Sequence, residues 1–345
     1  MTGGATRAGE TIHATLALYD PKGTYSQHAG VVMTSIFENT ESPVVVHVLH
    51  DNTLTEGARE KFLCTAAKYA QEVHLVDVTP YRDQLDARTV ALVQDACSVG
   101  TLYRLLIPDL LSIDRAVYLD CDTLVNLDLR ELWEVSLDGK CLAGALDHPG
   151  RGLRRLSAEA LRVRLNGGDP ASYVNAGVLL MDLDRIRERG SLFQASMDWL
   201  AHRGHTARLA DQDILNSLFR GSIKLLDGRF NNRRLEGDPS HSILHMINES
   251  KPWLGLTGLP SERLYWRTYL RSAWGDHMTP DELIDLLSQT ASHTPSLHRH
   301  TAQCWRQIGR RVRRDVLCGE PALTAGLLVR ELFHRLAAGL CGGPR

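Results

Sequence analysis

The sequence predicts an α/β protein with a Rossmann-like mixed sheet flanked by helices, followed by a helical C-terminal extension. Short apolar runs alternate with helix-length segments through the first half of the chain, which is the order of βαβ units. One of these apolar runs stops at two carboxylates, as a buried strand does at the edge of a sheet. The chain has 345 residues, 43% of them hydrophobic, which is enough for a sizeable core.

The expected elements follow one another closely along the chain. We expect strands at 12–18, 44–49, 73–78, 117–119 and 141–146, and helices at 28–39, 55–70 and 101–111. No G-x-G-x-x-G motif follows the first strand, which disfavours a dinucleotide-binding domain. The segment 149–172 is irregular and glycine-rich, and both a lid beside a site and a surface excursion without a role fit it.

Composition argues against several classes of protein. The formal net charge of −2 gives no general attraction to nucleic acid. The seven cysteines form no C-x-x-C pair, which argues against a zinc module or a disulfide scaffold. Residues 1–10 are polar and hold no apolar run that resembles a signal peptide. We therefore expect a cytoplasmic protein with reduced thiols and no nucleic-acid partner.

The most informative feature is the end of the run at 117–119, where Asp120, Cys121 and Asp122 follow. In an extended backbone, side chains two residues apart point the same way, so both carboxylates can share one cation while Cys121 faces protein. Hard oxygen ligands suit Mg²⁺ or Mn²⁺. An isolated Asp-x-Asp is weak support, because such pairs also occur in turns and on solvated surfaces.

Three further strings follow in order: 173–181 (YVNAGVLLM), 211–216 (DQDILN), and His245 six residues before Lys251-Pro252-Trp253. Together with Asp120 and Asp122, they resemble the family 8 glycosyltransferases, which are retaining enzymes of GT-A fold that include bacterial lipooligosaccharide galactosyltransferases and glycogenin. The resemblance runs from about Thr11 to Trp253. It implies a flexible N-terminus at 1–10, a GT-A domain at 11–287, and a linker with a basic, mostly helical extension at 288–345.

The resemblance implies a metal site made by Asp120, Asp122 and His245. Transfer from a nucleotide sugar releases a diphosphate, and a divalent cation stabilises the negative charge that grows on it. An imidazole ligand favours Mn²⁺ over Mg²⁺. Lys251 is expected to contact the same diphosphate. The sequence departs from the family's pattern at Asn248, where the better-known bacterial enzymes carry glycine.

The resemblance also implies contacts to the sugar nucleotide donor. Tyr19 and Asp20 would contact uracil and ribose, although Pro21-Lys22-Gly23 makes the following turn longer than in simpler members. Asp147 and Asn175 would contact sugar hydroxyls. The full set of expected donor-binding residues is Ala17, Tyr19, Asp20, Arg104, Asp120, Cys121, Asp122, Asp147, Asn175, Gln212, His245 and Lys251. For Arg104, the alternative is a solvated position on a helix face.

The expected catalytic residues are Gln212, Asp211 and Asp213. The resemblance places Gln212 beside the anomeric carbon, where an amide oxygen stabilises an oxocarbenium-like centre during front-face substitution. A covalent intermediate would instead need a carboxylate, and Asp211 and Asp213 are the candidates. Asp211 is also a plausible N-cap of a helix that buries Ile214 and Leu215. The sequence leaves both mechanisms open.

These inferences predict a metal-dependent retaining glycosyltransferase that moves a hexose, galactose or glucose, from a UDP-sugar to an unidentified acceptor. The acceptor is a sugar, a glycolipid or a small molecule. Two alternatives stay open: a non-catalytic UDP-sugar-binding member of the family, and a nucleotidyltransferase. The stretch 296–314 has no acidic residue and places arginines around an apolar stripe. This pattern fits a helix packed on the catalytic domain or a peripheral contact with an anionic membrane.

Overall fold

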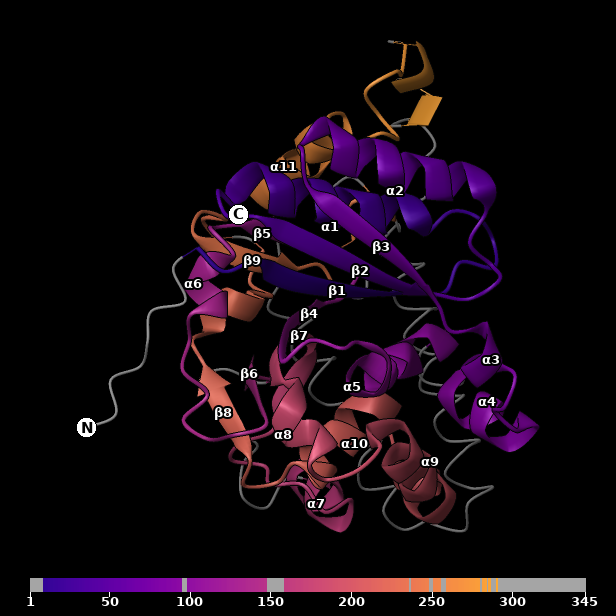
Figure 1. The fold of residues 1–345 in the computed structure, drawn as a ribbon, viewed down its shortest axis with the longest axis vertical. Helices are drawn as coiled ribbons and strands as arrows, with labels where there is room; N and C mark the ends of the chain where they lie inside the picture. The colour runs from indigo at the N-terminus through magenta and orange to yellow at the C-terminus, as the bar shows by residue number, and fades with distance from the viewer. Residues whose placement is uncertain are drawn as a thin grey trace, which may run out of the picture.

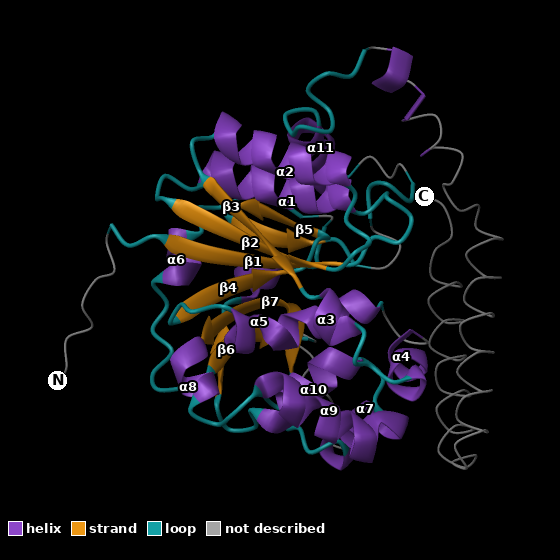
Figure 2. Ribbon diagram, turned by 45° about the vertical axis from the view of Figure 1, so that its right-hand side comes forward, coloured by secondary structure: helices purple, strands orange, loops and turns teal. Residues whose placement is uncertain are grey.

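The computed structural model describes residues 9–94, 98–147, 158–235, 237–247, 251–255, 259–279, 281–283, 285–286 and 290 (Figures 1 and 2). Nearly all of the N-terminus at 1–10, the first part of the irregular segment, Asn248 and nearly all of the extension at 288–345 lie outside the described residues. Within the described part, no helix has both the length and the apolar character needed to span a bilayer.

Seven strands form one mostly parallel sheet in the order β3-β2-β1-β4-β7-β6-β8. Only β7 runs antiparallel to its two neighbours, which confirms the predicted mixed sheet. The strands are β1 (Ile12–Leu18), β2 (Val44–His50), β3 (Glu72–Asp77), β4 (Arg115–Leu119), β6 (Leu142–Leu146), β7 (Val174–Asp182) and β8 (Ile223–Leu226). A second, two-stranded sheet pairs β5 (Thr123–Asn126) with β9 (Ser242–His245).

Helices cover both faces of the large sheet (Figure 2). On one face lie α1 (Ser26–Asn39), α2 (Glu56–Lys68) and α11 (Pro260–Tyr269). On the other side are α3 (Thr79–Arg82), α4 (Ala87–Gln94), η1 (Val99–Leu106), α5 (Ile107–Leu110), α7 (Ala158–Leu165), α8 (Leu183–Arg187), α9 (Leu192–Arg203) and α10 (Ala210–Leu218). The remaining short elements are α6 (Arg130–Trp133), η2 (Gly204–Thr206) and η3 (Gly228–Asn231).

The core has one layer on each face of the sheet. Strand β2 is buried along its whole length, as expected for a parallel strand covered by helices on both faces. One layer packs alternate residues such as Leu16 and Val46 against α1 and α2. The other packs Leu49 and Tyr118 against η1 and α10. The strands expected from the sequence all occur, with ends shifted by at most two residues.

One expected element differs in type. The helix predicted at 101–111 is a 3₁₀ helix, η1, followed by one α-helical turn, α5. Pro108 lies at the start of α5, where its missing N–H prevents a continuous α-helical hydrogen-bond ladder through the junction. Segment η1 is buried almost throughout, so tertiary contacts stabilise a helix type that is weak in isolation.

The topology gathers the informative segments at one edge of the sheet. Asp120 follows the end of β4, Asn175 lies near the start of the antiparallel β7, and Asp147 follows β6. In the small sheet, Thr123 pairs with His245. The residues after β4 are thereby held beside the end of β9, 122 positions apart in the sequence.

Candidate active site

Asp120, Asp122 and His245 form a candidate metal group, as the sequence predicts. One ligand atom from each lies within 4.8 Å of the other two. His245 Nε2 is 3.2 Å from Asp122 Oδ1 and 3.6 Å from Asp120 Oδ2. Two carboxylates and one imidazole fit Mn²⁺ or Mg²⁺, with the nitrogen favouring Mn²⁺. The pairing of β5 with β9 places His245 beside the turn that carries the two carboxylates.

The backbone of this group differs from the extended conformation that we expected. The N–H of Thr123 donates to the Asp120 carbonyl at 3.1 Å, which closes a turn over residues 120–123. The carboxylates therefore converge through a turn and not through the pleat of a strand. The expectation that Cys121 faces protein is confirmed, since it is buried and its Sγ contacts the Ala17 carbonyl at 3.2 Å. Burial raises the pKa of this thiol well above its usual value.

Gly177 makes room for the metal group, a role that the sequence analysis missed. A Cβ at this position would overlap the His245 ring and would lie 2.8 Å from Asp120 Oδ2. The Gly177 carbonyl also accepts the Asp120 N–H at 2.8 Å. The signal was available, because a glycine inside an otherwise apolar strand often marks a close approach of another group.

Lys251 lies directly beside the metal group. Its Nζ is 2.7 Å from Asp122 Oδ2 and donates to the Tyr25 hydroxyl at 3.1 Å. Burial alone would raise the pKa of Asp122, but the neighbouring His245 and Lys251 outweigh it and lower the pKa below its ordinary range. Asp122 is therefore a charged ligand at neutral pH.

Arg104 is buried and linked to two carboxylates, which excludes the alternative of a solvated helix face. Its Nη2 is 2.7 Å from Asp120 Oδ1, and its Nη1 is 3.1 Å from Asp211 Oδ2. The same Nη1 donates to the Ala176 carbonyl at 2.7 Å. Asp120 Oδ1 additionally accepts a hydrogen bond from the Tyr118 hydroxyl at 2.6 Å. Arg104 thus ties together β4, β7 and α10.

The two expected contacts to sugar hydroxyls, Asp147 and Asn175, lie in one hydrogen-bonded group with Gln212. Asn175 Nδ2 donates to Asp147 Oδ1 and to Gln212 Oε1, each at 3.1 Å. The backbone N–H of Ala176 also donates to Gln212 Oε1, at 3.1 Å. Among the residues that the structure describes, none pairs with the buried Gln212 Nε2. Gln212 is therefore held by its oxygen and keeps two unused N–H donors.

The two acidic neighbours of Gln212 both have partners within the protein, and their expected catalytic roles stay predictions. Asp211 is not an N-cap, because α10 begins at Ala210 and no side chain caps it. Instead Asp211 turns toward Arg104, and burial raises its pKa although Arg104 opposes the shift. The Asp213 carboxylate accepts hydrogen bonds from the backbone N–H groups of Arg208 and Leu209, just before α10, at 2.9 and 3.1 Å.

Asp213 has further partners that use up its carboxylate. Arg162 Nη1 lies 2.6 Å from Oδ2, and the Tyr173 hydroxyl donates to Oδ1 at 2.6 Å. The Asp213 side chain is fully buried. Its carboxylate therefore anchors α10 to α7 and to the residue before β7.

At the end of β1, Asp20 forms the turn that leads into α1. Its carboxylate accepts the N–H groups of Thr24, Tyr25 and Ser26, each at 2.8 Å, and the Ser26 hydroxyl at 2.6 Å. Only 2% of Asp20 is exposed. Its expected contact to ribose stays a prediction, as does that of the partly exposed Tyr19.

Two further residues at the site were not found from the sequence. Arg233 Nη1 is 2.8 Å from Asp147 Oδ1, and its Nη2 donates to the Leu146 carbonyl at 3.0 Å. Asn231 Oδ1 lies 2.9 Å from His245 Nδ1. Asn231 ends η3 and Arg233 follows it; this short segment has no motif of its own, so spacing alone gave no signal.

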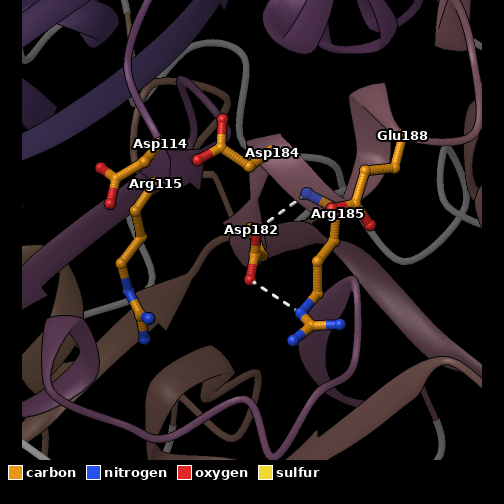
Figure 3. A pocket seen from close by; sticks show the side chains of 6 residues that line it. All are labelled: Asp114, Arg115, Asp182, Asp184, Arg185 and Glu188. Atoms are coloured by element: carbon orange, nitrogen blue, oxygen red, sulfur yellow. Dashed lines mark hydrogen bonds and ion pairs between the residues drawn. The ribbon is translucent and has the colours of Figure 1, made fainter.

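A separate cavity of about 260 Å³ lies at the opposite edge of the sheet (Figure 3). Asp114 and Arg115 line it at the start of β4. Asp182 lines it at the end of β7, and Asp184, Arg185 and Glu188 line it in and just after α8. Asp182 Oδ2 is 3.3 Å from Arg185 Nε. Because Arg115 begins the strand that ends before Asp120, this cavity is not part of the candidate active site.

Comparison with solved structures matches the fold. A structure of the galactosyltransferase LgtC in complex with donor and acceptor sugar analogues is similar with a TM-score of 0.63 and 23% sequence identity. The match covers 80% of this chain and 100% of that chain. The glycosyltransferase GlyE of Streptococcus pneumoniae matches with a TM-score of 0.56 at 20% identity, covering 76% of this chain and 62% of GlyE. The GT-A fold expected from the sequence is confirmed.

Comparison with known sequences gives relatives in bacteria and in the plant Arabidopsis thaliana. The lipopolysaccharide 1,2-glucosyltransferase of Escherichia coli is 24% identical over 283 residues, which are 76% of this chain and 80% of that protein. Glycosyltransferase GlyB of Streptococcus pneumoniae is 26% identical over 228 residues, covering 60% of this chain. The chain spans 51% of GlyB and between 41% and 60% of three other relatives. The model of "Glycosyl transferase family 8" matches residues 18–257, and the chain belongs to this family.

Proposed function

We propose that the chain is a metal-dependent retaining glycosyltransferase that moves a hexose, galactose or glucose, from a UDP-sugar to an acceptor. The observation that carries this proposal is the metal group of Asp120, Asp122 and His245 with Lys251 on one side of it. The amides of Asn175 and Gln212 contact each other, and Asn231 links Asn175 to His245 of the metal group. The candidate active site thus has two adjoining halves. The metal group and Lys251 form the cation-binding half, and the neutral amides of Asn175 and Gln212 form the amide half.

The cation-binding half suits a leaving diphosphate. A bound Mn²⁺ or Mg²⁺ would neutralise charge that develops on the departing oxygen. Lys251 adds an ammonium, 2.7 Å from Asp122, that is positioned to contact phosphate oxygens once a cation shares that carboxylate. Arg104 balances the charge of Asp120 and Asp211 and orients both carboxylates.

The amide half suits the transferred sugar. The unused N–H donors of Gln212 provide hydrogen-bond partners for hydroxyls. Asp213 already has four partners, which supports the front-face mechanism over one with Asp213 as nucleophile. Asp211 forms an ion pair with Arg104, which it shares with Asp120, and this pairing lowers its value as a nucleophile.

The acceptor and the location stay proposals from the sequence. The relative from Escherichia coli is named a lipopolysaccharide glucosyltransferase, which supports glucose as donor sugar and a glycolipid as acceptor. The LgtC structure holds donor and acceptor sugar analogues, which supports a two-substrate transfer. A cytoplasmic location, with a peripheral membrane contact through the extension at 288–345, is the arrangement that we propose.

The test is a donor screen with the purified chain. UDP-glucose, UDP-galactose and UDP-N-acetylhexosamines are incubated with Mn²⁺, with Mg²⁺ or with EDTA, and UDP release is measured. We expect UDP to be released from a UDP-hexose only when Mn²⁺ or Mg²⁺ is present. The rate of release should fall at least 100-fold in Asp122→Asn. Asp138→Asn is the matched control, because the Asp138 side chain is 62% exposed and pairs only with surface groups in the described structure. Unchanged turnover in EDTA would reject the proposal.

A further inference from the structure

A continuous chain of hydrogen bonds joins the metal group to the sugar contacts. It runs from His245 Nδ1 to Asn231 Oδ1 at 2.9 Å, and from Asn231 Nδ2 to Asn175 Oδ1 at 2.8 Å. It continues from Asn175 Nδ2 to Gln212 Oε1 at 3.1 Å. All four side chains are at least 90% buried. The central member, Asn231, belongs to none of the motifs recognised in the sequence.

Two backbone N–H groups fix which atom donates and which accepts along this series of hydrogen bonds. The N–H of Gly177 donates to Asn175 Oδ1 at 3.0 Å, and the N–H of Ala176 donates to Gln212 Oε1 at 3.1 Å. A backbone N–H can only donate, so the side-chain atom that it meets must be the amide oxygen. The orientations of Asn175 and Gln212, which are ambiguous for an isolated amide, are therefore determined.

The direction passes on to Asn231 and then to His245. Because Asn175 presents its oxygen, Asn231 must meet it with Nδ2 and must turn its own oxygen toward His245. That oxygen can only accept, so the proton of the imidazole lies on Nδ1. His245 Nε2 faces Asp122 Oδ1 at 3.2 Å and is thereby kept as the metal-binding nitrogen.

We propose that Asn231 is a positioning residue that sets the tautomer of His245. It also holds His245 of the metal group and Asn175 of the sugar contacts in a fixed position relative to each other. The inference rests on the proposed function, since it assigns these two halves to one reaction. Asn231 is itself neither a member of the metal group nor one of the expected sugar contacts. It acts through His245 on one side and through Asn175 on the other. Loss of each contact therefore has a different consequence.

Two substitutions separate the two contacts. Asn231→Ala removes both, so His245 loses its acceptor, and we expect Mn²⁺ affinity to fall 10- to 100-fold. Asn231→Asp keeps an acceptor for the Nδ1 proton but cannot donate to Asn175 Oδ1. We expect this variant to retain Mn²⁺ affinity within about threefold while kcat falls at least 10-fold, an estimate from the typical cost of a lost active-site hydrogen bond.

Affinity is measured by calorimetric titration of Mn²⁺ without any sugar nucleotide, so the result does not depend on activity. The neighbouring Asn232→Ala is the matched control. It loses contacts to the Arg234 N–H and Ser242 within the same segment and is expected to leave Mn²⁺ affinity unchanged. Thermal unfolding of each variant shows whether it folds. If Asn231→Ala binds Mn²⁺ as tightly as the wild type while His245→Ala does not, the proposal is overturned.

A second readout reports the tautomer directly. In the full chain with histidines labelled by ¹⁵N and Mg²⁺ bound, the spectrum of His245 is assigned by its loss in His245→Gln. We expect a protonated Nδ1, with the proton lost to exchange in Asn231→Ala and restored in Asn231→Asp. A protonated Nε2 with a bare Nδ1 in the wild type would refute the proposal. Should the donor screen fail, these two measurements still decide the role of Asn231.

Discussion

At the scale of single residues, the groups around Gln212 differ in how much of their hydrogen-bonding capacity is used. Asp213 is filled by four donors, and Asp211 shares Arg104 with Asp120. The Gln212 side chain, by contrast, has a buried Nε2 whose N–H donors meet no group in the described structure. A buried amide with unused donors is costly unless a ligand completes it. This favours Gln212 as the residue that the substrate contacts.

We therefore expect Gln212→Ala to reduce kcat by about 100-fold or more while changing UDP affinity by less than about threefold, the range seen when one transition-state hydrogen bond is lost. The physical reason is that, in the proposed reaction, the Gln212 amide contacts the transferred sugar and not the diphosphate. Steady-state kinetics and calorimetric binding of UDP check both numbers. Gln194→Ala is the control, because Gln194 is exposed and bonds only to Asp198 and Ser191 in the described structure. A variant impaired solely in UDP binding would remove Gln212 from catalysis.

The sequence predicted the identities of the metal group but not the residues that orient it. Asp120, Asp122 and His245 belong to motifs that a family resemblance carries over. Asn231 and Arg233 are defined only by tertiary contacts, with Asn231 lying 56 positions from Asn175. Such contacts follow no local period. Pattern reasoning therefore finds the residues that belong to recognisable motifs and misses those that only tertiary contacts bring to the site.

At the scale of elements, strands were easier to predict than helix types and turns. Strand β2 is a continuous apolar run, and burial on both faces makes that signal strong. The 3₁₀ form of η1 and the turn at 120–123 depend on packing against neighbouring elements, which a single sequence does not show. The N-cap assigned to Asp211 failed for the same reason, because Arg104 attracts it away.

Strand β7 supplies the wall against which the metal group is built, and this gives a prediction for Gly177→Ala. The added Cβ would overlap the His245 ring and crowd Asp120, and the central strand cannot move away without losing its pairing to β4. We expect Mn²⁺ affinity to fall at least 10-fold and stability to fall by about 1–3 kcal/mol. Calorimetric titration and urea unfolding measure these effects.

The matched control for this substitution is Gly57→Ala. Gly57 lies in α2, and a Cβ there meets nothing within 4 Å. Alanine should stabilise this helix by up to about 1 kcal/mol, because it has the higher helix propensity. Unchanged metal binding in Gly177→Ala would show that the close approach has no bearing on the metal group.

Strands β1, β2 and β3 carry a histidine cluster that predicts acid sensitivity. Burial, and then the charges of His13 and His74, lower the pKa of His47 from 6.5 to about 4. The unfolded chain thus binds more protons than the folded one between these values. Stability is fully present above about pH 6.5 and falls as the pH drops toward 4.

We expect His47 to add up to about 1.4 kcal/mol per pH unit to the slope of unfolding free energy in this window. Urea unfolding at several pH values between 7 and 4.5 measures the slope. His47→Asn should make it shallower, whatever its effect on stability at pH 7. His277→Asn is the control, because that side chain is 92% exposed. Equal slopes in wild type and His47→Asn would contradict the pKa assigned to His47.

At the scale of the whole molecule, the candidate active site and the separate cavity lie at opposite ends of strands β4 and β7. The metal group, Lys251 and the amides all lie where β4 ends and β7 begins, whereas the cavity of Figure 3 lies at the other edge. The α/β class and the sheet could be predicted because they follow from alternating patterns along the chain. The acceptor could not, because acceptor loops vary independently of the framework that binds the donor.

This arrangement leads to a prediction for the stereochemistry of the product. In the proposed geometry, the metal group and Lys251 hold the diphosphate on one side of the anomeric carbon, and Gln212 lies across from them. Gln212 offers an amide and no carboxylate, so an acceptor entering from the side of the departing diphosphate gives retention without a covalent intermediate. An α-linked UDP-hexose should therefore yield an α-linked product.

The anomeric proton coupling of the isolated product, read by NMR, measures the configuration, and free hexose released by hydrolysis is analysed at early times as an internal control. A small coupling, typical of the α configuration, is the expected result. A β-linked product would require attack from the Gln212 side. In that case the packing of Gln212 against Asn175 and Ala176 would have to open to admit the acceptor, and the assignment of a retaining reaction would fall even with the fold unchanged.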